Sequence, residues 1–75
     1  MDLVERLVVS PGPGVFSPLP DLPEELDVGT TLGFVRSCDR ELPVVSAFRG
    51  RLVSMVAVAG ERLEQYQRVA WLRAS

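Results

Sequence analysis

The sequence predicts a single all-β domain, a flattened β-barrel or sandwich of two four-stranded halves related by a pseudo-two-fold axis. A chain of 75 residues is long enough for one domain, so residues 1–75 are taken as one unit. Short apolar runs are separated throughout by Gly and Pro, without a long helical period. The second half of the chain also repeats the spacing of the first, which is typical of a duplicated supersecondary unit.

The first strands are predicted between rigid turns. Residues 3–10 alternate loosely between apolar and polar side chains, which favours a strand. Residues 10–14 contain two Pro and two Gly and indicate a turn, after which Val15 and Phe16 begin a second strand. Residues 17–23 are expected to form a loop, because their prolines cannot donate to a β-ladder.

The middle of the chain predicts an acidic loop followed by a β-hairpin. Residues 30–36 are rich in β-forming side chains, residues 37–40 are polar and compact, and residues 42–48 return as a second strand. Pro43 favours an edge position for the returning strand, because proline has no amide to donate. The loop before this hairpin is interpreted as a solvated acidic surface that contains Asp21, Glu24, Glu25 and Asp27.

Two interpretations compete for the end of the chain. Residues 51–58 predict another strand that ends before Gly60, residues 61–66 fit a helical turn or a loop, and residues 68–72 predict the last strand. The alternative is a terminal helix after Gly60, because Glu, Leu, Gln, Arg and Ala in this stretch have high helix propensity.

The internal repeat decides in favour of the strand. An offset of 36 residues places Gly14 on Gly50. Because residues 30–36 are predicted to be a strand, the matching residues 67–73 are expected to be one as well. An offset of 37 residues matches Pro23 with Gly60, Leu26 with Leu63, Gly29 with Tyr66, Leu32 with Val69, and Val35 with Leu72.

The repeat also predicts which residues shape the interior. Gly14 and Gly50 are expected where strands bend sharply, and Gly60 where a tight turn needs a positive φ. Trp71, in the last strand, is expected to be half-buried. The inward-facing layer is expected to contain Leu32, Leu52, Met55, Leu63, Val69 and Leu72.

The composition argues against several classes of function. Ten acidic and eight basic residues give a net charge of −2, which disfavours nucleic-acid binding and gives no attraction to an anionic membrane. A single Cys, no signal peptide and no apolar run of transmembrane length favour a cytoplasmic location. With no His, no metal-ligand cluster and no phosphate-binding loop, we expect no metal site, no cofactor and no enzymatic activity of the isolated chain.

All eight basic residues are Arg, and the chain contains no Lys. No side chain can therefore form an amide or a Schiff base through an ε-amine. The N-terminus is the one primary amine of the chain.

In their order and separation these segments resemble the biotinyl and lipoyl carrier domains, the family of the biotin carboxyl carrier protein. Residues 8–14 are similar to the opening strand and the Ser-Pro-Met-Pro-Gly turn of biotin carriers, and residues 26–35 to the segment before the acceptor hairpin. Residues 50–72 resemble the segments after that hairpin, with Tyr66 where Gly is usual. The resemblance covers about residues 7–73 and implies a barrel-sandwich hybrid whose modified lysine lies at a hairpin tip.

The resemblance fails at that tip, where biotin carriers read Glu-Ala-Met-Lys-Met. Counting from Gly29 or from Gly50 places Asp39 at the position of the acceptor lysine, and a carboxylate cannot form the stable amide that a carrier needs. The resemblance therefore implies a degenerate carrier that acts as a non-modified interaction or accessory subunit, for example of an acyl-CoA carboxylase-like or specialised biosynthetic complex. The five positions of the tip motif are occupied by Arg36, Ser37, Cys38, Asp39 and Arg40.

The altered tip supplies the candidate interaction residues, and several alternatives stay open. Arg is frequent in interface hot spots, which favours protein docking. The tip is otherwise an ordinary solvated turn, or Cys38 is a non-standard attachment point whose thiolate the two arginines favour and Asp39 opposes. A newly acquired small-molecule or catalytic site, and a homo-oligomer formed through open sheet edges, are the remaining alternatives. The candidate residues are Arg36, Cys38, Asp39, Arg40 and Glu41.

Overall fold

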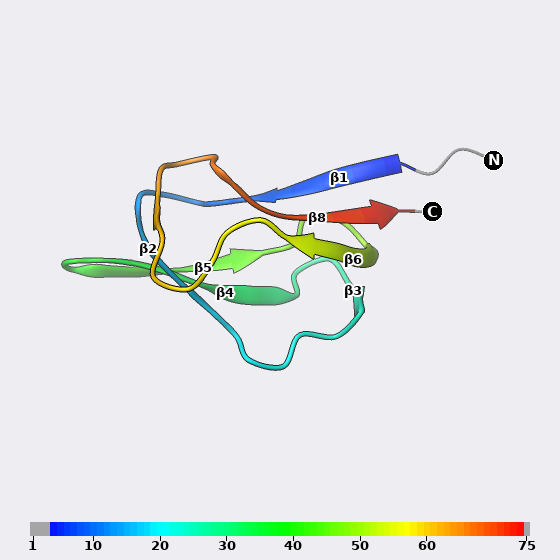
Figure 1. The fold of residues 1–75 in the computed structure, drawn as a ribbon, viewed down its shortest axis with the longest axis horizontal. Helices are drawn as coiled ribbons and strands as arrows, with labels where there is room; N and C mark the ends of the chain where they lie inside the picture. The colour runs from blue at the N-terminus through cyan, green and yellow to red at the C-terminus, as the bar shows by residue number, and fades with distance from the viewer. Residues whose placement is uncertain (1–3, 75) are drawn as a thin grey trace.

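A computed structural model describes residues 4–74 and contains two four-stranded antiparallel sheets that enclose one hydrophobic core (Figure 1). The sheets have the strand orders β1-β8-β6-β3 and β5-β4-β2-β7. The predicted all-β sandwich with two four-stranded halves is therefore confirmed. Its strands are β1 (Val4–Val9), β2 (Gly14–Pro18), β3 (Glu25–Leu26), β4 (Thr31–Ser37), β5 (Arg40–Val45), β6 (Gly50–Met55), β7 (Arg62–Leu63) and β8 (Arg68–Ala74).

The two sheets are related by the internal repeat. Exchanging β1 with β5, β2 with β6, β3 with β7 and β4 with β8 converts one strand order into the other. Each sheet contains strands from both halves of the chain, so neither half can complete a sheet alone. The repeat thus describes one closed structure with pseudo-two-fold symmetry.

The last strand confirms that the repeat was the correct guide to the end of the chain. Strand β8 lies between β1 and β6 in its sheet and pairs with both. The competing helix after Gly60 is therefore wrong. Backbone pairing with two neighbours and burial of Val69, Ala70 and Leu72 override the helix propensity of the individual residues.

Two glycines matched by the repeat allow a close approach of backbone segments. A Cβ added at Gly14 would lie 2.7 Å from the carbonyl oxygen of Arg36, and one at Gly50 would lie 2.7 Å from that of Arg73. Arg36 and Arg73 are themselves matched by the 37-residue offset. The same contact therefore occurs twice, at the positions where sharp bends were predicted.

Tyr66 adopts the same backbone conformation as Gly29, the residue that it matches in the repeat. Gly29 has a φ of 90° and Tyr66 a φ of 67°, so both adopt the left-handed conformation. Their amides donate matched hydrogen bonds, from Gly29 to the carbonyl of Ser46 at 2.7 Å and from Tyr66 to the carbonyl of Ser10 at 2.8 Å. Tyr66 keeps the turn but accepts a strain that glycine avoids.

The predicted inward-facing residues belong to the core or pack against it. Leu32, Leu63, Val69 and Leu72 are fully buried, whereas Leu52 and Met55 are partly buried against the core. Trp71 is half-buried, as expected. The core also contains Val8, Phe16, Leu26, Val35, Val44, Ala57 and Ala70.

Several predicted boundaries in the first half differ from the structure. Residues 17–23 were expected to be loop from the start, but β2 continues through Ser17 and Pro18, which pairs with Gly33 at the end of the ladder. Proline is tolerated at such a terminal position. The acidic segment is also not a pure loop, because Glu25–Leu26 forms the short strand β3. Of the first predicted strand, residue 3 lies outside the described residues.

Strands β5 and β6 end earlier than predicted, whereas β8 continues two residues beyond its predicted end, to Ala74. Strand β5 ends at Val45, because the next residue, Ser46, is buried and starts a turn. Its position at the edge of the sheet agrees with the prediction made from Pro43. Strand β6 ends at Met55 and leaves residues 56–58 outside the ladder. Within residues 4–74 there is no helix with the length and apolar character needed to cross a membrane.

Candidate functional site

The candidate site is the tip of the hairpin formed by β4 and β5. The strands pair in register up to Ser37 and Arg40, which leaves Cys38 and Asp39 as a two-residue turn. This hairpin projects from one end of the molecule, and the start of β1 and the end of β8 lie at the other (Figure 1). The long axis of the molecule measures 45 Å. Asp39 in this turn is exposed to solvent.

Two of the five candidate residues bind each other. Arg36 and Glu41 are cross-strand partners, and the Arg36 Nε donates a hydrogen bond of 2.8 Å to Glu41 Oε2. The Nη2 of Arg36 contacts the same oxygen. Their side chains are 67% and 44% exposed, so the pair contributes little to stability, about 0.2–1 kcal/mol. Its main effect is to hold both side chains along the hairpin.

The other three candidates form the exposed apex. Cys38, Asp39 and Arg40 are all exposed, and Cys38 is a free thiol. The guanidinium of Arg36 binds the carboxylate of Glu41 on the neighbouring strand and is not part of this apex. The apex therefore presents one thiol, one carboxylate and one guanidinium to a partner.

The first Gly-Pro turn packs against the hairpin close to its tip, a contact that the sequence did not reveal. Pro11, Gly12 and Pro13 face Leu42 and Arg40 across a cavity of about 270 Å³. A Cβ at Gly12 would lie 3.0 Å from the Cδ1 of Leu42, so the turn packs closely against the hairpin. Besides forming the turn, these residues therefore contact the hairpin next to its apex.

The residue types at the tip limit the chemical groups that it presents. Neither the tip nor any other part of the chain offers a lysine or a histidine side chain. Within residues 4–74, no three Cys or carboxylate side chains come close enough to hold a metal ion. The exposed side chains of the tip can form hydrogen bonds and ion pairs to another molecule.

The fold and the tip together define a class, an all-β sandwich of two duplicated four-stranded sheets with one projecting hairpin. A crystal structure of urea carboxylase from Kluyveromyces lactis contains a similar structure, with a TM-score of 0.78 over 92% of this chain and 18% sequence identity. This chain spans 6% of the length of that carboxylase chain. The likeness shows the fold. No protein-family model and no curated protein sequence matches the chain.

Proposed function

We propose that the chain is a degenerate biotinyl-type carrier domain that acts as a non-modified protein-interaction or accessory module in the cytoplasm. One observation carries this proposal. The hairpin that corresponds to the acceptor hairpin of biotin carriers is kept and exposed, while Asp39 occupies the acceptor position in a chain without lysine.

The chemistry of attachment supports a binding role. Biotin and lipoate are held through an amide to an amine nucleophile, and a carboxylate at the turn cannot supply that nitrogen. A shift of the alignment by one or two residues does not help, because no neighbouring residue is a lysine. The domain therefore works without a swinging arm and without catalysis of its own.

The expected partner is a protein complex of the kind in which carrier domains operate. Biotin- or lipoate-dependent assemblies such as an acyl-CoA carboxylase are candidates, as are biosynthetic complexes that recruited the fold. The likeness of the fold to a portion of a urea carboxylase supports this choice. The exposed Arg40 and Asp39 provide orientation to such a contact, since charged rims fix register more than they add affinity.

Affinity purification from the native host tests the proposal. A matched variant with Cys38→Ser, Asp39→Asn and Arg40→Gln removes the charges of the tip at nearly constant size. We expect the wild-type chain to retain a stable protein partner and the variant to lose it. A wild-type chain that stays monomeric and binds no protein would contradict the proposal.

Intact mass of the chain from the same host separates this function from a carrier with another attachment chemistry. We expect the mass of the unmodified chain. An adduct that disappears in Cys38→Ala would instead support attachment at the hairpin turn, and one that persists in this variant would direct attention to the N-terminal amine.

A further inference from the structure

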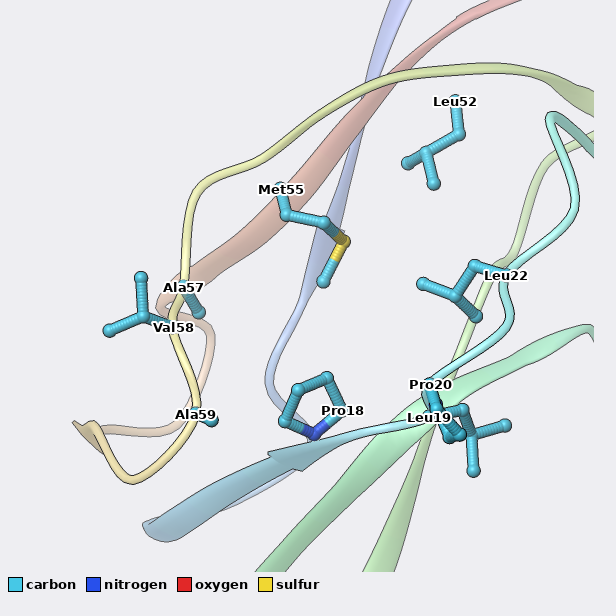
Figure 2. Close-up of a pocket in the computed structure, with 9 residues that line it drawn as sticks. All are labelled: Pro18, Leu19, Pro20, Leu22, Leu52, Met55, Ala57, Val58 and Ala59. Atoms are coloured by element: carbon cyan, nitrogen blue, oxygen red, sulfur yellow. The ribbon is translucent and has the colours of Figure 1, made fainter.

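An apolar groove of about 480 Å³ lies between the loop after β2 and the segment formed by β6 and the loop that follows it (Figure 2). Leu19 and Leu22 line it from the loop after β2, Leu52 and Met55 from β6, and Val58 from the loop after β6. Figure 2 shows the side chains of Leu22, Leu52 and Met55 reaching into the same space. Every side chain that lines the groove is apolar.

The symmetry of the fold explains why this side is open. Residues 18–22 and 55–59, which flank the groove, are matched by the 37-residue offset, so the groove lies about the pseudo-two-fold axis. The edge strands here, β3 and β7, have two residues each, so loops replace strands over this part of the core. Leu19 and Val58 remain 37% and 64% exposed as a result.

The surroundings of the groove are acidic. Residues 7–35 contain four acidic residues and no basic one, and residues 52–61 contain one acidic residue and no basic one. Asp21 is exposed between two residues that line the groove, and the amide of Leu52 donates to the carbonyl of Glu24 at 2.7 Å. Arg51 reaches Glu24 at 3.5 Å and Arg49 reaches Asp27 at 3.0 Å, but both pairs are exposed and neither involves Asp21.

The apolar lining and the acidic rim together favour apolar ligands that carry positive charge. The acidic rim repels fatty acids and acyl thioesters that carry phosphates, because like charges across an interface oppose binding. It attracts a chain in which an apolar side chain stands beside Lys or Arg. A groove of this volume accepts one bulky side chain with its neighbouring backbone.

We propose that this groove binds a partner protein segment through a bulky apolar side chain flanked by Lys or Arg. The proposal rests on the proposed function in that both make the chain a binding module. It places a contact on a surface that shares no lining residue with the hairpin turn.

Peptides selected from a random phage-displayed library on the immobilised full chain test the proposal. We expect the selected peptides to share a Leu, Met, Phe or Trp with a Lys or Arg within three positions. A labelled synthetic peptide of the selected sequence then gives dissociation constants by fluorescence anisotropy. In Asp21→Arg and Ala59→Leu, which reverse the rim charge and fill the groove, we expect binding to weaken by at least about tenfold.

Glu64→Arg is the matched control, because it makes the same charge change at an exposed residue that does not line the groove, and it is expected to change affinity less than about twofold. Circular dichroism of each variant confirms folding. Enrichment of no peptide, or of peptides without basic residues, would overturn the proposal. Peptides that lose affinity in Asp39→Arg but not in Asp21→Arg would overturn it too, while leaving the proposed function at the hairpin supported.

Discussion

The interior of the sandwich and the turn of its projecting hairpin differ in how strongly the fold dictates their residues. In the interior, the two halves place equivalent residues at matched positions. Gly14 and Gly50, for example, each pack against the carbonyl of a facing strand. The turn residues Cys38 and Asp39, by contrast, are exposed and lie outside the β-ladder. The fold therefore constrains the matched interior residues more strongly than the turn residues.

The largest effect of these tests is expected at the two matched glycines, where a facing carbonyl leaves no room for a side chain. Gly50→Ala places a methyl group 2.7 Å from the Arg73 carbonyl and is expected to lower the free energy of unfolding by about 2–4 kcal/mol. Gly14→Ala is expected to cost more, because its φ of 150° adds strain to the same contact. Urea denaturation measures both changes.

Gly29→Ala is the control for this comparison. A Cβ there would meet nothing within 4 Å, so only its φ of 90° opposes the substitution and about 1 kcal/mol is expected. If Gly50→Ala lowers the free energy of unfolding no more than Gly29→Ala does, close approach of the backbones does not set the cost of the substitution.

A second matched pair, the buried serines, is expected to have the next largest effect. The hydroxyl of Ser10 donates to the carbonyl of Gly12 at 2.7 Å, and that of Ser46 to the carbonyl of Phe48 at 2.6 Å. Replacing either serine with Ala is expected to cost about 1–2 kcal/mol, since a buried acceptor loses its partner. The exposed Ser54→Ala is expected to cost less than about 0.5 kcal/mol in the same urea titrations.

Tyr66 offers a test in the stabilising direction. Its φ of 67° is strained for any side chain, and 71% of the residue is exposed, so few contacts are lost on its removal. Tyr66→Gly is expected to raise the free energy of unfolding by about 0.5–1 kcal/mol. Thermal unfolding monitored by circular dichroism measures the change, and a lower melting temperature would mean that the phenol ring stabilises the turn.

The smallest effect is expected at the hairpin. A double-mutant cycle on Arg36→Ala and Glu41→Ala is expected to give a coupling below about 0.5 kcal/mol that shrinks with added salt, because the pair is solvent-exposed. A coupling above about 1.5 kcal/mol would mean that the tip contributes to the fold as the interior does.

The difference between interior and turn also explains what the sequence could predict. The repeat revealed β8 despite its helix-forming residues, because matched apolar positions reflect tertiary pairing that propensity ignores. It also placed the turn at Tyr66 before its φ was known. Strands β3 and β7 were missed as strands, since two residues are too few for any period to appear.

The contacts around the hairpin and around the groove could not be predicted from the sequence. The packing of Gly12 against Leu42 and the groove around Leu22 and Met55 join segments far apart in the chain. No local pattern marks such neighbours. The candidate residues of the tip could be located from counts to Gly29 and Gly50, but the mutual binding of Arg36 and Glu41 came from the strand register.

Restoring the acceptor motif tests most directly whether this is a carrier scaffold altered at its tip. The variant replaces residues 36–40 by Arg36→Glu, Ser37→Ala, Cys38→Met, Asp39→Lys and Arg40→Met, and it is incubated with a biotin ligase, biotin and ATP. Intact mass spectrometry is expected to show one added biotinyl group on this variant and none on the wild-type chain. A variant that folds like the wild type but gains no biotinyl group would contradict the assignment of this hairpin as a former acceptor site.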